Sequence, residues 1–190
     1  VTAMKYLLSA LMLAAAPAFA ATAVVGQPAP LFSATDPSGT VVSLADFKGK
    51  TVVLEWVNPE CPYVRKHYDS TNMQATQKAA TAKDVVWLSV NSTHPSHSDH
   101  KKPAEMAAWM QQQKAAATHT LMDSDGKIGK AYGARTTPHM YIVDAKGTLA
   151  YAGGIDDKPS SNPADVKTAK NYVNAALGDV LAGKPVAQAV

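Results

Sequence analysis

The sequence predicts an α/β fold in which helices flank a central mixed sheet. Two apolar, β-branched runs, 51–57 and 85–90, are typical of buried strands, and a segment with helical signals follows each of them. Later in the chain, strands at 139–143 and 149–152 are joined by the turn Asp144-Ala145-Lys146-Gly147, which predicts an antiparallel hairpin. Strands that alternate with helices, followed by a closing hairpin, indicate a sheet with both parallel and antiparallel pairs.

The elements before residue 100 are predicted from turn residues and helix starts. Asp36-Pro37-Ser38-Gly39 is a turn signal, because Pro fixes one turn dihedral and Gly tolerates the other. Pro62 is suited to the first position of a helix, where its missing N–H would have no partner anyway. We therefore expect a hairpin over 31–43, a helical turn over 44–48, a helix from Pro62 that breaks near 69–72, and a second helix over 73–82.

The later elements are predicted in the same way. Asn162 is a suitable N-cap, Pro163 a suitable first position, and apolar residues recur at helical spacing up to Leu181. Gly183 and Pro185 should end this last helix, which is expected as one piece. Before it we expect a helix over 104–116, a short strand over 118–122 and a helical turn over 128–132.

The first twenty residues predict a segment that does not belong to the fold. Met4-Lys5 precedes an apolar run over 6–16, and Ala18-Phe19-Ala20 ends it with small residues. This is the pattern of a secretory signal peptide cut after Ala20, and the run is too short to span a bilayer. The expectation is a signal peptide over 1–20, one domain over 21–190, and a periplasmic or secreted protein.

Composition narrows the classes of partner. The 190 residues include 18 Lys and Arg against 15 Asp and Glu, with no basic cluster, which argues against nucleic acid. No second apolar stretch is long enough to span a membrane in the mature chain. The chain has one cysteine, Cys61, and so cannot form an internal disulfide. An odd cysteine in an exported protein is buried and inert, paired between chains, or reactive.

The position of Cys61 favours a reactive thiol. The strand 51–57 ends at Asn58-Pro59, and Pro62 begins a helix directly after the cysteine. Cys61 should thus lie at the N-terminus of a helix, where unpaired N–H groups and the helix dipole stabilise an anion. A thiol in such a place is shifted toward the reactive thiolate.

Three segments in order resemble the thioredoxin fold, and within it the redoxin group of exported thioredoxin-like and AhpC/TSA-related, peroxiredoxin-like proteins. The segments are Val53-Leu54-Glu55-Trp56 with Cys61-Pro62-Tyr63-Val64, then Gly133-Ala134-Arg135-Thr136-Thr137-Pro138, then Tyr141-Ile142-Val143-Asp144 with Gly147 and Tyr151-Ala152-Gly153. The resemblance covers roughly residues 24–183. It implies a thioredoxin-like α/β fold and thiol chemistry at Cys61.

The sequence departs from both chemistries that the resemblance implies. Thioredoxin-like oxidoreductases carry Cys-x-x-Cys, and the second position here is Val64, so an external thiol must complete the exchange. Peroxiredoxins carry Pro-x-x-x-Thr-x-x-Cys, and the Thr and Pro positions here hold Asn58 and Leu54. Asn58 is a candidate donor to a peroxide oxygen, and Arg135 is a candidate substitute for the peroxiredoxin arginine.

The resemblance assigns further roles near Cys61. Glu55 occupies the place of the buried acid that moves protons in thioredoxins; the alternative is an edge position with its carboxylate in water. Thr137-Pro138 resembles the cis-proline loop that faces the cysteine; the alternative is an ordinary trans turn. Tyr63 is expected to line the approach to the thiol, and Trp56 to be plain core.

Other polar residues are expected to be solvated. Arg65, one turn past Cys61, either adds positive potential or belongs to an exposed face, and His67 is expected at the surface. Three histidines, His94, His97 and His100, resemble a metal-binding tract, but they lack a companion cluster and favour a solvated loop. No metal or cofactor is expected.

Two functions of different classes remain. The first is an exported oxidoreductase in which Cys61 attacks a peroxide or a disulfide and an external thiol, or a redox partner protein, resolves the product. The residues expected to serve it are Cys61, Glu55, Asn58 and Pro138 in catalysis, and Tyr63, Thr137 and Arg135 in substrate binding. The second is a non-catalytic binding module for a peptide or a metal. The sequence leaves open whether two chains form a homodimer.

Overall fold

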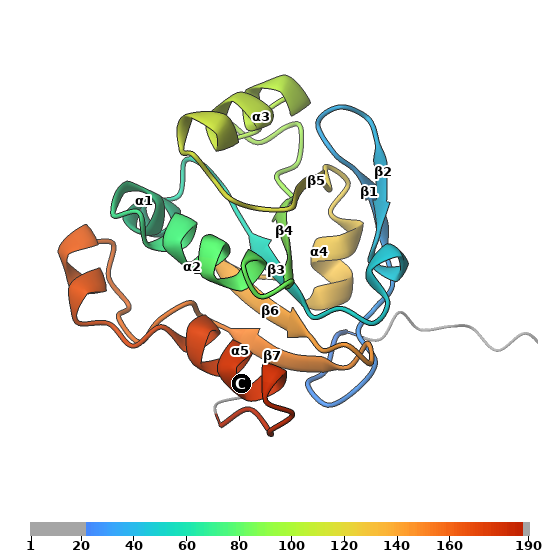
Figure 1. The fold of residues 1–190 in the computed structure, drawn as a ribbon. Helices are drawn as coiled ribbons and strands as arrows, with labels where there is room; N and C mark the ends of the chain where they lie inside the picture. The colour runs from blue at the N-terminus through green and yellow to red at the C-terminus, as the bar shows by residue number, and fades with distance from the viewer. Residues whose placement is uncertain (1–21, 188–190) are drawn as a thin grey trace, which may run out of the picture.

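The computed structural model describes residues 22–187, which form a seven-stranded sheet with helices on both faces (Figure 1). The predicted signal peptide lies outside the described residues. The strands are β1 (Ser33–Thr35), β2 (Val41–Ser43), β3 (Val52–Trp56), β4 (Val86–Asn91), β5 (His119–Met122), β6 (His139–Val143) and β7 (Leu149–Gly153). The helices are α1 (Pro62–Asp69), α2 (Asn72–Thr81), α3 (Pro103–Gln112), α4 (Lys127–Tyr132) and α5 (Tyr172–Leu181), with 3₁₀ turns η1 (Leu44–Phe47) and η2 (Pro163–Lys167).

The sheet is mixed, as predicted. Its strand order is β2-β1-β5-β4-β3-β6-β7. β3, β4 and β5 run parallel to one another, whereas β6 is antiparallel to both β3 and β7, and β1 is antiparallel to β2 and β5. The strand that leads to Cys61, β3, is therefore an interior strand that is paired on both sides.

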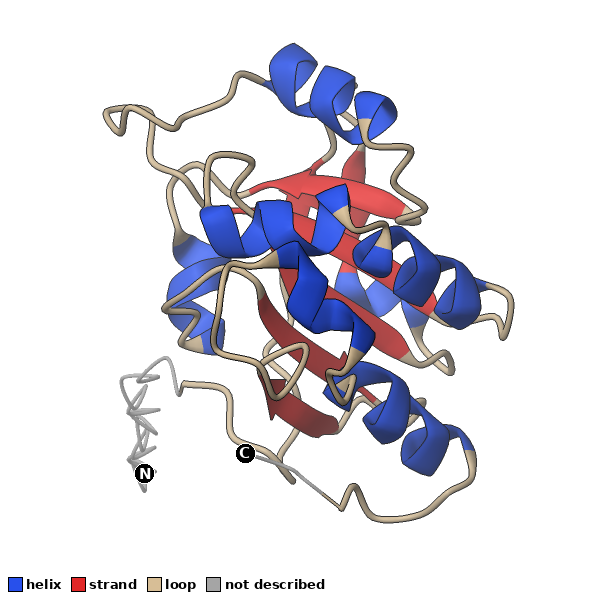
Figure 2. Cartoon of the chain, turned by 90° about the vertical axis from the view of Figure 1, so that its left-hand side faces the viewer, coloured by secondary structure: helices blue, strands red, loops and turns tan. Residues whose placement is uncertain are grey.

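Both faces of the sheet are buried, which explains why β3 is a nearly continuous apolar run. Val53 faces the core beneath α1, α2, α3 and α5, where Tyr68, Met73 and Met106 pack. Leu54 and the other alternate residues face a second core shared with α4 and the β1–β2 hairpin. Figure 2 looks onto the helical layer, in blue, that covers the first of these faces.

The break between the first two helices lies where the sequence predicts it. α1 ends at Asp69 and α2 begins at Asn72, with Thr71 between them in the left-handed region at φ 62°. The break lets α2 pack along β4 while α1 keeps its start beside the end of β3. α3 ends at Gln112, earlier than the predicted end near residue 116.

The prediction of one continuous C-terminal helix was wrong. Asn162 caps a helical start as expected, because its side chain accepts from the N–H of Ala164, but the turn that follows is only the short η2. The chain then extends so that Tyr172 N–H donates to the carbonyl of Ile155 at 2.8 Å, and Asn171 caps α5. Tertiary pairing with the segment after β7 thus overrides the local helical pattern.

None of the helices in residues 22–187 combines the length and the apolar character that crossing a bilayer requires.

Candidate functional site around Cys61

Cys61 lies at the joint between β3 and α1, as the sequence predicts. It is the N-cap residue of α1, with Pro62 in the first turn, and it is partly exposed. Its N–H donates to the carbonyl of Asn58 at 3.0 Å, and its carbonyl accepts from Arg65 N–H at 3.0 Å. The thiol is therefore held at the N-terminus of an eight-residue helix, close to backbone N–H groups that favour an anion.

The loop before β6 faces the thiol. The Thr137–Pro138 peptide bond is cis, which confirms the expectation. The Cys61 Sγ donates to the carbonyl oxygen of Thr137 at 3.2 Å. Two segments 76 residues apart in the sequence thus meet at the sulfur.

Asn58 shapes the turn that presents Cys61. Its Oδ1 accepts from the N–H of Glu60 at 3.0 Å, and its Nδ2 donates to Asp99 Oδ2 at 2.9 Å. The bond from Asn58 is the main reason that the pKa of Asp99 is lowered. Both ends of the amide are engaged within the chain, so the geometry gives Asn58 a positioning role. Its role as a donor to a peroxide stays a prediction.

The basic side chains next to Cys61 are paired. Arg65 donates from Nε to the carbonyl of Pro59 at 3.0 Å and forms an ion pair with Glu60. Lys101 also pairs with Glu60, at 2.7 Å, and its hydrogen bond is the main cause of the lowered pKa of Glu60. Arg65 is about half exposed, as on the exposed face that the sequence left open, and its charge is paired with Glu60.

Glu55 is fully buried, as the functional interpretation requires. Burial raises the pKa of its carboxyl group, and the hydrogen bond from Tyr68 is the largest of the contacts that oppose this rise. Oε1 accepts from Tyr68 Oη at 2.7 Å, while Oε2 accepts from Trp87 Nε1 at 2.8 Å and from two further donors, Gln77 and Ser89.

Cys61 is not among the residues that form hydrogen bonds with the Glu55 carboxyl group. Within residues 22–187, all four hydrogen-bond partners of the Glu55 carboxyl come from α1, α2 and β4. The carboxyl is thus well suited to hold α1 and α2 against the sheet. A role for Glu55 in proton transfer to Cys61 stays a prediction.

Two open pockets flank the loop that faces the thiol, and both are lined by Thr136 and Thr137. The first, here called the proline pocket, has a volume of about 490 Å³. It is lined by Tyr63, Lys66, His67, Thr136, Thr137, Pro138, Gly154, Ile155, Asp156, Asp157, Lys158, Pro159, Ser160 and Tyr172. Tyr63, about half exposed, thus lies beside the site as predicted.

The second, here called the arginine pocket, has a volume of about 340 Å³. It is lined by Trp56, Val57, Asn58, Ser92, Thr93, His94, His97, Gly129, Ala134, Arg135, Thr136 and Thr137. The structure therefore brings the candidate residues Asn58, Thr137 and Arg135 around one cavity.

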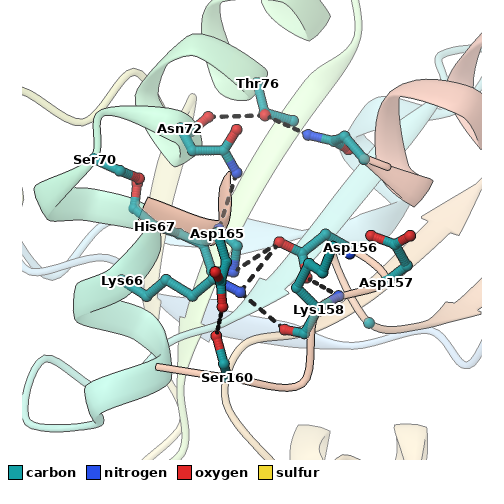
Figure 3. Close-up of polar contacts among 12 residues, drawn as sticks. Lys66, His67, Ser70, Asn72, Thr76, Asp156, Asp157, Lys158, Ser160 and Asp165 are labelled. Atoms are coloured by element: carbon teal, nitrogen blue, oxygen red, sulfur yellow. Dashed lines mark hydrogen bonds and ion pairs between the residues drawn. The ribbon is translucent and has the colours of Figure 1, made fainter. Parts of the chain in front are cut away.

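Three titratable side chains that line the proline pocket are buried, and Figure 3 shows the polar contacts among them. Lys66 and His67 come from α1, and Asp156 comes from the loop after β7; their side chains are 1%, 3% and 5% exposed. Asp156 Oδ2 lies 3.4 Å from Lys66 Nζ and 3.7 Å from His67 Nε2. Lys66 Nζ also donates to the carbonyl of Lys158 at 2.9 Å. The expectation that His67 lies at the surface was wrong.

His67 is held as a neutral imidazole. Its Nδ1 lies 2.9 Å from Asn72 Nδ2, which can only donate, so the ring proton belongs on Nε2, facing Asp156. Burial lowers the pKa of His67 to about 4, although Asp156 acts in the opposite direction. The network in Figure 3 continues from Asn72 to Thr76, whose hydroxyl donates to the backbone carbonyl of Asn72. The same hydroxyl accepts from the side chain of Asn171 at the start of α5.

A signal for the burial of His67 is present in the sequence. Val64, His67 and Tyr68 have the i, i+3, i+4 spacing of one helix face, and all three are buried. No comparable local signal marks the burial of Asp156, because Lys66 and His67, which face its carboxylate, lie far away in the sequence.

The histidine loop makes mostly local contacts. His94 Nδ1 bonds with Ser96, His97 Nδ1 accepts from the N–H of Asp99, and His100 Nδ1 lies 3.0 Å from the carbonyl of Thr93. In the described part of the chain, no group of three or more His, Cys, Asp or Glu residues is arranged to hold a metal ion.

Comparison with known proteins supports the resemblance that the sequence shows. The chain is 28% identical over 132 residues to the thiol-disulfide oxidoreductase ResA of Bacillus thuringiensis subsp. konkukian. That match covers 66% of this chain and 66% of the relative, slightly less than two thirds of its length. The name of this relative is that of an oxidoreductase, in agreement with the enzyme class expected from the sequence.

Solved structures confirm the thioredoxin-like fold. An uncharacterized conserved protein from Geobacillus kaustophilus is 26% identical with a TM-score of 0.73, and the match covers 87% of this chain and 86% of that one. A putative thiol:disulfide interchange protein DsbE from Chlorobium tepidum is 23% identical with a TM-score of 0.59, covering 83% of this chain and all of that one. The AhpC/TSA family matches residues 25–152, more than half of the 190 residues. The chain therefore belongs to the AhpC/TSA family.

Proposed function

We propose that this protein is a thiol-dependent oxidoreductase in which the single cysteine, Cys61, is the nucleophile. The observation that carries the proposal is the position of its sulfur, at the N-cap of α1 and 3.2 Å from the carbonyl of Thr137 beside Pro138. The thiolate is the form that attacks, and the backbone N–H groups at the start of α1 lie close to the sulfur. Membership of the AhpC/TSA family supports the same chemistry.

In the peroxide version, the thiolate attacks one oxygen of a hydroperoxide. An S–O bond forms and the O–O bond breaks, so that the sulfur is oxidised to a sulfenic acid and the peroxide is reduced to an alcohol or water after taking up a proton. The backbone N–H groups at the start of α1 stabilise the negative charge near the sulfur. Asn58 keeps the preceding turn in place for this attack.

In the disulfide version, the thiolate attacks one sulfur of a disulfide. A mixed disulfide forms on Cys61 and the other sulfur leaves as a thiolate. Both versions require an external thiol to regenerate Cys61, since the chain contains no second cysteine. In the peroxide version, an external thiol condenses with the sulfenic acid, which releases water and leaves a mixed disulfide on Cys61. In both versions, a thiol then attacks the outer sulfur of the mixed disulfide, so that the outer group leaves as part of a new disulfide and Cys61 leaves as the reduced thiolate. A small thiol or a redox partner protein serves this role.

The remaining residues have supporting roles in this proposal. Tyr63, Thr137 and Pro138 border the thiol and contact the incoming substrate, and Arg135 contributes charge from the neighbouring pocket. We further propose that the protein acts outside the cytoplasm as an antioxidant, with a signal peptide over residues 1–20 removed from the domain over 21–190. Such a compartment is where a protein without a second cysteine meets oxidants and exported redox partners.

The test is oxidation and turnover of the full chain with hydrogen peroxide or with the disulfide of a small thiol, each with excess dithiothreitol. We expect one of the two oxidants to be consumed. In a sample treated with that oxidant without dithiothreitol, mass spectrometry should detect a sulfenic acid or a mixed disulfide on Cys61. Cys61→Ser should lose all turnover above the rate without protein. If neither oxidant modifies Cys61, the redox proposal is wrong and the binding-module interpretation takes its place.

A further inference from the structure

The arginine pocket differs from the proline pocket in its charge. Three of its lining residues are basic, Arg135, His94 and His97, and no Asp or Glu is among its lining residues. The proline pocket, by contrast, is lined by two lysines, one histidine and two aspartates, so that its basic residues are accompanied by acidic ones. The two pockets share Thr137, whose carbonyl contacts Cys61 Sγ. Cys61 itself is not among the lining residues of the arginine pocket, which is connected to the sulfur through Thr137.

The charge of Arg135 is available to a ligand. Within residues 22–187, its guanidinium group has neither an ion-pair partner nor a hydrogen-bond acceptor; only its backbone N–H is engaged, with His139 Nδ1 at 3.4 Å. Arg65 provides the contrast, because its guanidinium is bonded to Glu60 and to the carbonyl of Pro59. An unpaired guanidinium presents a planar set of donors that matches a carboxylate or another oxyanion.

The two imidazoles add donors of the same kind. The Nδ1 of His94 accepts from the N–H of Ser96, and the Nδ1 of His97 accepts from the N–H of Asp99. In the neutral ring the remaining proton is therefore on Nε2, so each histidine offers an N–H donor.

Two carboxylates lie near the arginine pocket, and both are engaged by groups of the protein. Asp99 accepts from Asn58 Nδ2 and lies 3.9 Å from His97 Nδ1. Asp123 accepts from Ser92 Oγ and from two backbone N–H groups at the start of α4. Neither carboxylate forms an ion pair with Arg135, so the guanidinium remains the available charge.

We propose that the arginine pocket binds the carboxylate of an acidic oxidant, with Arg135 as the group that selects for negative charge. This inference rests on the proposed function, and it names the class of substrate: a small organic hydroperoxide or disulfide that carries a carboxylate. The volume of about 340 Å³ is at the lower end of ligand pockets, which suits a short chain rather than a large molecule. With the carboxylate on Arg135, the reactive end of the oxidant lies toward Cys61.

The test compares two alkylating reagents, iodoacetate and iodoacetamide, on Cys61 of the full chain. The reagents are similar in size and share a leaving group, but only iodoacetate carries a negative charge. Both react with the same thiolate, so the ratio of their rate constants cancels the thiolate fraction and reports the preference for an anion. We expect Arg135→Gln to lower the iodoacetate-to-iodoacetamide ratio by about two- to fivefold, the range of a partly exposed ion pair.

Two further variants make the result specific. Arg135→Lys keeps the charge and should keep most of the ratio. Lys146→Gln removes one charge from the β6–β7 turn, at the end of β6 away from Pro138, and should leave the ratio unchanged. An unchanged ratio in Arg135→Gln, or an equal fall in Lys146→Gln, would overturn the proposal.

Failure of this inference can be told apart from failure of the proposed function. Alkylation needs no oxidant and no reductant, so the ratio is measured whether or not the protein turns over. Turnover with an unaffected ratio keeps the redox function and overturns the carboxylate site. A fall in the ratio without any turnover supports the anion site and overturns the redox function.

Discussion

The two pockets beside Cys61 share one wall and use charge in opposite ways. In the proline pocket, Lys66 and Asp156 are almost completely buried and are paired with each other. In the arginine pocket, Arg135 is exposed and has no partner within the described residues. A buried ion pair costs desolvation and must be compensated inside the protein, whereas an exposed, unpaired cation is ready to meet an anion from solution. The first arrangement serves the fold, and the second is suited to a ligand.

The largest expected effect concerns the buried pair. Asp156→Asn removes the charge that compensates Lys66, and the ammonium group remains buried. We expect the free energy of unfolding to fall by about 3–5 kcal/mol, measured by urea denaturation. The matched control is Asp84→Asn, which removes a carboxylate 2.9 Å from Lys50 at a site where both side chains are exposed. This control should have a small effect, because surface ion pairs contribute little.

A double variant separates charge from packing in the same cluster. Lys66→Met combined with Asp156→Leu removes both charges while filling a similar volume, so we expect it to be more stable than Asp156→Asn alone. A double variant as unstable as the single one would mean that the hydrogen bonds of the cluster, and not its charge balance, hold the loop after β7 to α1.

The second prediction concerns the pH dependence of stability. Burial lowers the pKa of His67 to about 4 from an ordinary value of 6.5, with Asp156 and Lys66 as the charged groups that face it. Between these two values the unfolded chain binds a proton on this imidazole and the folded chain does not. Stability is therefore complete above pH 6.5 and is lost as the pH falls from 6.5 to 4, by roughly 3 kcal/mol.

Urea denaturation of His67→Gln across this pH range checks the assignment. The variant should lose most of the slope, because its side chain does not titrate. His97→Gln, which changes a 58% exposed imidazole of the arginine pocket, should keep the slope of the unmodified protein. Equal slopes in the unmodified protein and in His67→Gln would contradict the assignment.

The parts of the fold that the sequence predicts well are those set by local patterns. The buried strand β3 follows from its apolar run, and Cys61 at a helix start follows from Pro62 directly after it. The Lys66–Asp156 contact has no such pattern, since the β7–η2 loop returns to α1 from far along the chain; the bond from Lys66 to Lys158 spans 92 residues. The burial of His67 is an intermediate case. The helical spacing places His67 on the same face as Val64 and Tyr68, so its burial can be predicted only if that face of α1 is known to be the buried one.

The same distinction explains why the prediction for the last helix was wrong and why the charge environment of the site could not be predicted. The segment before Tyr172 carries helical residues, but pairing with Ile155 extends it. At the site, Arg135 is close to Pro138 in the sequence. Whether its guanidinium is paired or free depends on the acidic residues that loops from other parts of the chain bring near it. Contacts between distant segments decide both outcomes, and local propensity does not encode them.

The smallest expected effect is a change of substrate preference in the arginine pocket. A hydroperoxide that carries a carboxylate should be used with a higher kcat/KM than its methyl ester, because only the acid pairs with Arg135. In Arg135→Gln this preference should fall by about two- to fivefold, chiefly through KM, while the kcat/KM for the ester changes little. Raising the salt concentration should reduce the preference in the unmodified protein, since salt screens an exposed pair.

Asp156→Asn should change the stability of the protein without reversing the preference. A loss of preference in that variant equal to the loss in Arg135→Gln would mean that the two pockets act as one site, and the contrast between them would have to be given up.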